Sequence, residues 1–154
     1  MSEEQTVFSI EKIYLKDLSI EVPNAPQIFL ERESPDIEVQ IRNAATNIGE
    51  GMFEVALTVT VTATMGEGEA AQSFFLVEAA QAGIFQIRNV ADQDIDPLLA
   101  IACPNILFPY VRETVADAVS RAGFPPMHLS PVNFEALYQQ RQIESSAQSP
   151  APLQ

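Results

Sequence analysis

The sequence has little of the side-chain chemistry that enzymes use. Among its 154 residues there is one cysteine, Cys103, one histidine, His128, and no tryptophan. A single cysteine can form no internal disulfide and cannot build a multi-cysteine metal site, which favours a reducing compartment. A catalytic nucleophile needs a base within hydrogen-bond reach, and we expect both residues to have packing roles instead. The sequence therefore predicts no catalytic residue, no enzymatic activity and no metal site.

Basic residues are also scarce. Eight Lys and Arg residues stand against 21 Asp and Glu residues, for a formal net charge of −13, and the cations are scattered along the chain. Such a surface repels phosphate backbones, so we expect no nucleic-acid partner, whereas cationic partners should be attracted. Because 47% of the residues are hydrophobic, the chain should fold and not behave as a disordered polyanion.

Long apolar runs are missing. Residues 1–10 lack a cationic segment followed by an apolar run, and no stretch of about 18 uninterrupted apolar residues occurs. We therefore expect a protein that is neither exported nor inserted into a membrane. A length of 154 residues is typical of one domain.

Two sequence features resemble parts of ligand-binding motifs but lack residues or positions that those motifs require. Asp92, Asp94 and Asp96 have the spacing that begins a calcium loop, but Pro97 and Cys103 stand where the loop needs a glycine and a bidentate glutamate. These aspartates are better explained as a solvated loop and a helix start. The glycines fall in turns and never open a helix after a buried strand, so neither a phosphate cradle nor a cofactor is expected.

Alternation of apolar and polar residues predicts four strands, at residues 7–22, 36–43, 53–64 and about 71–81. The alternation in the first strand breaks near Lys12, which predicts a bulge. The third strand has an apolar face and a threonine face, and the latter could line a small-ligand groove or simply be solvated; we favour solvation. Local turns at 47–51 and 65–68 indicate an antiparallel sheet.

The last third of the chain changes to a helical period. Apolar residues recur at intervals of four from Leu107 to Val119, which predicts a helix that ends at Gly123 and that Pro109 kinks or tightens. Asn133 should cap a second helix. Strands followed by helices indicate the α+β class, an antiparallel sheet with two C-terminal helices packed on one face. We expect the domain to span residues 7–142, with disordered ends at 1–6 and 143–154.

The connection from residue 23 to 35 is unusual, because it contains three prolines and yet carries Ile28, Phe29 and Leu30 in succession. The prolines exclude a central strand and a helix interior. Three consecutive large apolar residues in a loop must either pack inward or expose a patch. Both alternatives remain open from the sequence.

Four segments together resemble the SecB family: residues 13–26 (IYLKDLSIEVPNAP), 83–85 (GIF), 103–113 (CPNILFPYVRE) and 131–138 (PVNFEALY). The resemblance is nearly colinear over residues 7–142. It implies a four-stranded antiparallel Greek-key sheet with two helices, assembled as a dimer of dimers. It also implies a cytoplasmic, ATP-independent holdase chaperone that keeps precursor proteins unfolded and delivers them to SecA for Sec-dependent export.

The resemblance also implies two sites. The client-binding groove would comprise two sets of residues, one in the long loop and one in the last helix: Ile28, Phe29, Leu30, Phe134, Leu137 and Tyr138. The basic, zinc-containing C-terminal tail of SecA would dock on four sheet residues: Asp17, Glu21, Leu76 and Glu78. Asp17 and Glu21 have the same strand parity, which places them on one face.

Two other functions remain as alternatives. A SecB-like chaperone dedicated to the antitoxin of a toxin–antitoxin system would keep the grooves but would not need the acidic SecA surface. A small-molecule-binding or enzymatic domain would need a closed pocket with convergent polar groups. One histidine and one cysteine make that third class a poor fit.

Overall fold

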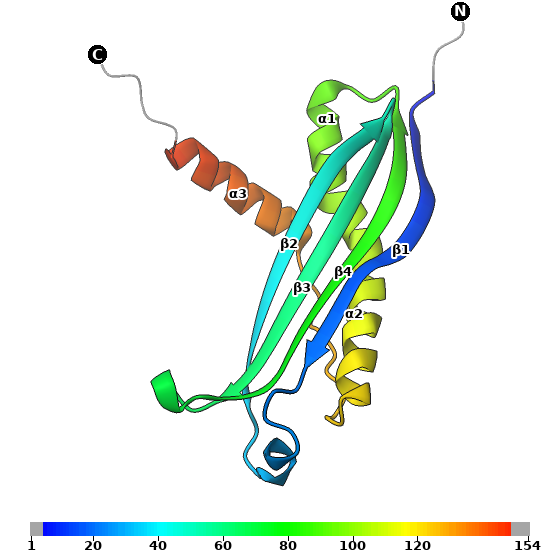
Figure 1. Cartoon of the computed structure of the whole chain (residues 1–154). Coiled ribbons are helices and arrows are strands. Elements are labelled where there is room, and N and C mark those ends of the chain that lie inside the picture. Colours follow the sequence, from blue (N-terminus) through cyan, green and yellow to red (C-terminus); the bar gives the residue numbers. More distant parts are fainter. Residues whose placement is uncertain (1–4, 149–154) are drawn as a thin grey trace, which may run out of the picture.

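The computed structural model describes residues 5–148, which form one antiparallel sheet with helices on one side (Figure 1). The four strands are β1 (Val7–Glu21), β2 (Asp36–Gly49), β3 (Met52–Met65) and β4 (Gln72–Arg88). Their order across the sheet is β1-β4-β3-β2. Hairpins join β2, β3 and β4, and the long connection after β1 lets the first strand pair with the last. This is the expected Greek-key topology.

The helical part follows the sheet in the chain. It consists of α1 (Asp92–Pro97), a π-helical segment η3 (Leu98–Ala102), α2 (Cys103–Arg121) and α3 (Phe134–Gln148). Two short 3-10 turns, η1 (Gln27–Leu30) and η2 (Gly68–Ala70), lie in the connections between strands. None of the helices in the described part of the chain is both long enough and apolar enough to span a membrane.

One face of the sheet carries the core, and α2 covers it (Figure 1). The odd-numbered β3 residues from Val55 to Ala63 are fully buried there. They meet the predicted helical stripe from Leu107 to Val119, which is buried on α2. Gly123 (φ +98°) then ends the helix in a left-handed conformation, and Phe124 N–H donates to the carbonyl of Val119. The predicted period-2 and period-4 patterns thus form the two sides of one core.

The opposite face, here called the open face, carries the even-numbered β3 residues, and no helix of the described chain lies over it (Figure 1). Thr58, Thr60, Thr62 and Thr64 are only partly buried there. β1 pairs with β4, and the register of this pairing shifts at Ile10/Lys12 and at Leu15/Asp17. The first shift confirms the predicted bulge. The second was not anticipated, and it makes Lys16 the inserted residue.

Two strands are longer than predicted. β2 continues past residue 43 because Ala44, Ala45 and Thr46 extend the ladder with β3. β4 likewise continues to Arg88. Alanine and glycine have weak intrinsic strand preference, and here pairing with neighbouring strands overrides it.

The ends of the domain also differ from the sequence prediction. Residues 143–148 were expected in the disordered tail, but α3 continues through them. Their Glu, Ser, Ala and Gln composition is compatible with a helix, and Gln140 donates to Glu144 one turn later. At the other end, the Thr6 hydroxyl donates to the carbonyl of Asn89, and the Asn89 side-chain amide donates to the carbonyl of Gln5. Residues 1–4 and 149–154 lie outside the described residues.

Candidate functional site

The connection after β1 brings its apolar residues against the end of α2. Ile28 is buried, with 3% of its surface exposed, whereas Phe29 is 46% exposed and its ring stacks on Phe124 at a centroid distance of 5.1 Å. Phe124 also contacts Phe74 and Phe75 of β4. These side chains line a pocket of about 460 Å³, which we call the loop pocket.

A second pocket, the helix pocket, lies between β2 and α3 and has a volume of about 300 Å³. Its apolar lining comes mainly from Ile41 of β2 and from Phe134 and Leu137 of α3. Phe134 is 4% exposed and packs edge-to-face on Phe108 of α2. Tyr138 also lines the pocket, and its hydroxyl donates to Asp96 Oδ2 at 3.1 Å.

A capping residue in the sequence determines where α3, one wall of this pocket, begins. Asn133 caps the helix as predicted, since its Oδ1 accepts from Ala136 N–H at 2.9 Å. The helix packs against η3 and projects past β2, so α2 is the helix that lies along the sheet (Figure 1). The opposite wall of the pocket is β2. There the side-chain amide of Asn43 donates to the carbonyl of Leu99 in η3 at 3.0 Å.

Five of the six client-site residues predicted from the resemblance line two separate pockets. Ile28 and Phe29 belong to the loop pocket, and Phe134, Leu137 and Tyr138 belong to the helix pocket. Leu30 is 80% exposed and lines neither.

Strand β2 links the two pockets. Ile37 lines the loop pocket, Ile41 lines the helix pocket, and Val39 lies between them with 40% of its surface exposed. Residues two apart on a strand share a face, and four residues span about 13 Å. We call the two pockets and this apolar strip the trough. β2 is also an edge strand of the sheet, with no strand beyond it among residues 5–148.

The four residues predicted to bind SecA lie together on the open face. The register pairs Asp17 with Ala80, Glu21 with Leu76, and Ser19 with Glu78. Residues paired in this way point to the same side of an antiparallel sheet. We call the surface formed by Asp17, Glu21, Leu76 and Glu78 the platform.

Cations reach two carboxylates of the open face from other strands. Arg42 of β2 crosses β3 and pairs with Glu78, with Nη2 2.9 Å from Oε1. Lys16 of β1 pairs with Glu54 of β3, with Nζ 2.8 Å from Oε1. No local sequence pattern predicts either pair, because each joins strands that are not adjacent in the sheet.

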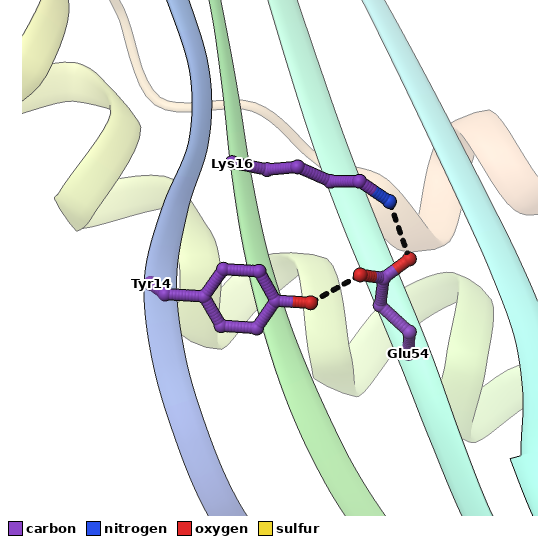
Figure 2. A network of polar contacts seen from close by, with 3 residues as sticks. All are labelled: Tyr14, Lys16 and Glu54. Carbon is purple, nitrogen blue, oxygen red and sulfur yellow. Dashed lines mark hydrogen bonds and ion pairs between the residues drawn. The ribbon is translucent and has the colours of Figure 1, made fainter.

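The Glu54 carboxylate also accepts a hydrogen bond from the Tyr14 hydroxyl (Figure 2). Figure 2 shows both β1 side chains extending over β4 to reach Glu54. In the register, Tyr14 lies opposite Ala82 of β4, and Glu54 lies opposite Ile84. The hydrogen bond from Lys16, followed by that from Tyr14, holds the pKa of Glu54 below its ordinary value. Burial, with help from Glu54, raises the pKa of Tyr14 to about 12.

The two residues with catalytic potential lie apart from these surfaces. Cys103 is fully buried at the start of α2, and burial raises the pKa of its thiol to about 12, which suppresses the reactive thiolate at neutral pH. His128 is exposed in the loop before α3. No three His, Cys, Asp or Glu side chains within residues 5–148 are grouped so that they could hold a metal ion.

Sequence reasoning missed the aromatic floor of the loop pocket, formed by Phe74, Phe75 and Phe124. As adjacent residues of a predicted strand, Phe74 and Phe75 indicate only that both faces of that strand are partly apolar. Phe124 directly follows the predicted helix end at Gly123, and a hydrophobic residue just after such a glycine commonly packs back on its helix. That local rule was the signal available for Phe124.

Comparison with known proteins gives a consistent result. The sequence profile of the family described as preprotein translocase subunit SecB matches residues 1–145. A relative named protein-export protein SecB from Dechloromonas aromatica is 59% identical over 152 residues, which cover 98% of this chain and 97% of the relative. Another of that name, from Azoarcus sp., is 64% identical over 138 residues, covering 90% of this chain and 89% of the relative.

The fold also matches a solved structure, that of the Mycobacterium tuberculosis Rv1957 SecB-like chaperone in complex with a ChAD peptide from the Rv1956 HigA1 antitoxin. The TM-score is 0.65 at 19% sequence identity, and the match covers 81% of this chain and 90% of that one. At this identity the likeness supports the fold. Together with the family profile and the relatives at 59% and 64% identity, it leads to one conclusion: the chain belongs to the SecB family of protein-export chaperones.

Proposed function

We propose that this chain is an ATP-independent holdase that binds unfolded precursor proteins in the trough and passes them to SecA from the platform. The observation that carries the proposal is the apolar strip of β2, which is exposed between two aromatic-lined pockets. Family membership supports the export role over an antitoxin-dedicated one, because the relatives cited above are named for protein export.

A trough of this kind suits clients that share no sequence. Burial of apolar surface contributes about 25 cal/mol per Å² and requires no matched polar groups. Ile37 and Val39 are exposed and Ile41 is partly buried, so they offer such surface along the strand direction, on which an extended segment could lay alternate side chains. Folded proteins keep their apolar residues inside, so this mode of binding selects unfolded chains.

The platform supports the second half of the proposal. Asp17, Glu21 and Glu78 form a carboxylate cluster beside the exposed apolar side chain of Leu76, on the face opposite α2. Such a surface complements a basic peptide, and in this family we assign that peptide to the zinc-containing C-terminal tail of SecA. Binding should therefore be fast and sensitive to ionic strength. The zinc would belong to SecA.

We also propose that the working form is a cytoplasmic homotetramer, a dimer of dimers. Apolar side chains on the β1 edge, namely Ile10, Leu15 and Leu18, are between 42% and 48% exposed in the isolated chain, as is expected for a surface that pairs with another copy. Several weak troughs on one assembly would then reinforce each other through effective concentration. Multi-angle light scattering should give four times the 16.9 kDa chain mass.

The test of the holdase function is suppression of aggregation. The full-length chain, mixed at near-stoichiometric ratio with a denatured precursor on dilution, should reduce light scattering without any nucleotide. The same precursor in its folded form should not bind. Unchanged scattering over a range of ratios would rule the function out.

The proposed binding of SecA to the platform has a separate test. Charge reversal by Asp17→Lys together with Glu21→Lys should abolish binding to SecA while precursor binding persists, because the trough lies on the other side of the sheet. SecA binding that survives both reversals would contradict the platform assignment.

A further inference from the structure

Arg42 forms an ion pair that crosses a strand on the open face. On β2 it stands opposite Thr58 of β3, and its guanidinium reaches over β3 to Glu78, whose register partner on β3 is Thr60. The side chains of Arg42 and Glu78 are 72% and 38% exposed, so the pair lies in solvent and can open.

Glu78 is also the central carboxylate of the platform. It lies opposite Ser19, between Asp17 and Glu21 along β1. Diagonal neighbours on antiparallel strands lie about 7–8 Å apart, so Glu78 is close to both of these acids. The guanidinium of Arg42 therefore places one positive charge at the middle of the surface proposed to bind a basic peptide.

We propose that Arg42 is an internal competitor for the platform: in the free chain it occupies Glu78, and the cations of SecA must displace it. This inference rests on the proposed platform function. An arginine or lysine of a partner would use the same carboxylate chemistry as Arg42, so the two cannot share Glu78 fully. Asp17 and Glu21 have no ion pair within the described residues and remain available for first contact.

The consequence is selectivity for partners with several cations. Because Arg42 leaves Glu78 free only part of the time, the apparent affinity of the platform for a partner falls in proportion to the free fraction. An exposed ion pair favours its closed form by roughly two- to fivefold, so Arg42 moderates binding and does not block it. A partner with one cation would lose by competition, whereas one with several could bind Asp17 and Glu21 first and then displace Arg42.

The test compares two substitutions of equal charge in the full-length chain. Arg42→Gln should tighten SecA binding by about three- to sixfold at physiological ionic strength, and the difference should disappear at high salt. Lys12→Gln removes a cation from the same face. In the strand register, however, Lys12 lies opposite Ile84, which is six residues along β4 from Glu78. That separation is roughly 20 Å, beyond the ~8 Å screening length at physiological salt, so no tightening is expected there.

The outcomes separate this inference from the function on which it rests. Equal tightening by both variants would show a general field effect and overturn the competitor role. If Arg42→Gln leaves SecA affinity unchanged, the competitor role is overturned. The platform assignment still stands in that case, provided that the Asp17 and Glu21 reversals abolish SecA binding. In a Glu78→Gln background, Arg42→Gln should have no further effect, and a persisting gain would again overturn the inference. Failure of the unmodified chain to bind SecA would remove the platform itself.

Discussion

Gly123 lies directly beneath the ring of Phe29. A Cβ placed on Gly123 would come within 2.9 Å of Cε1 of that ring, closer than real Cβ contacts allow. The glycine thus has two roles, since its φ of +98° ends α2 and its missing side chain leaves room for the aromatic wall of the loop pocket.

Gly123→Ala should therefore damage both stability and client binding. The left-handed backbone costs a non-glycine residue about 1–2 kcal/mol, and displacement of Phe29 should disturb the loop pocket. Urea unfolding and aggregation suppression measure the two effects. Gly68→Ala is the control, because Gly68 also has a positive φ (+63°) but nothing lies within 4 Å of the added Cβ. Equal loss of client binding in both variants would argue against the role of Phe29.

Phe29 and Leu30 are adjacent and apolar but should differ in function. Phe29 lines the loop pocket, and Leu30, although more exposed, lines neither pocket. Phe29→Ala should weaken client binding about five- to tenfold, since an aromatic contact contributes about 0.5–1.5 kcal/mol beyond its buried area. Leu30→Ala should bind an unfolded precursor like the parent chain in a fluorescence titration. A larger effect at Leu30 would contradict the pocket assignment.

Phe134 and Leu137 line the same pocket with different burial. Phe134 is nearly fully buried against Phe108, so Phe134→Ala should lower the free energy of unfolding by about 3–5 kcal/mol. Leu137 is half exposed, and Leu137→Ala should leave the unfolding midpoint almost unchanged while it weakens precursor binding. Urea unfolding together with a precursor titration separates the two roles. A marked loss of stability in Leu137→Ala would show that this side chain is structural.

Glu54 should make folding sensitive to acid. Lys16 and Tyr14 hold its pKa below the ordinary value, so the folded state favours the carboxylate. This stabilisation is present above the ordinary carboxyl pKa and is lost as the pH falls through the lowered pKa. Glu54→Gln should therefore cost about 1 kcal/mol at neutral pH and flatten the pH dependence of unfolding in the acid range.

The control for that experiment is Glu69→Gln, which removes an exposed carboxylate of η2. Urea unfolding at a series of pH values from neutral to acid should show the same slope for this control and for the parent chain. If Glu54→Gln and the parent chain also had identical slopes, the coupling of Tyr14, Lys16 and Glu54 to stability would be disproved.

Local patterns predicted most of the elements, because each depends on a short period. The alternation of β3, the four-residue stripe of α2, the stop at Gly123 and the cap at Asn133 were all confirmed. Strand and tail lengths were less accurate. Residues 44–46 have weak strand preference and extend β2 through pairing with β3, whereas residues 143–148 continue α3, with which their composition is compatible.

The sequence by itself determined the fold class, through the order of strands and helices, and the family, through four specific segments. It also determined that Asp17 and Glu21 share a face, because strand parity is local. Only the tertiary structure divided the client-site residues between two pockets, brought Phe124 under Phe29, and paired Arg42 with Glu78. These contacts join residues far apart in the chain, and their existence depends on strand order, register and loop path, which no local period encodes.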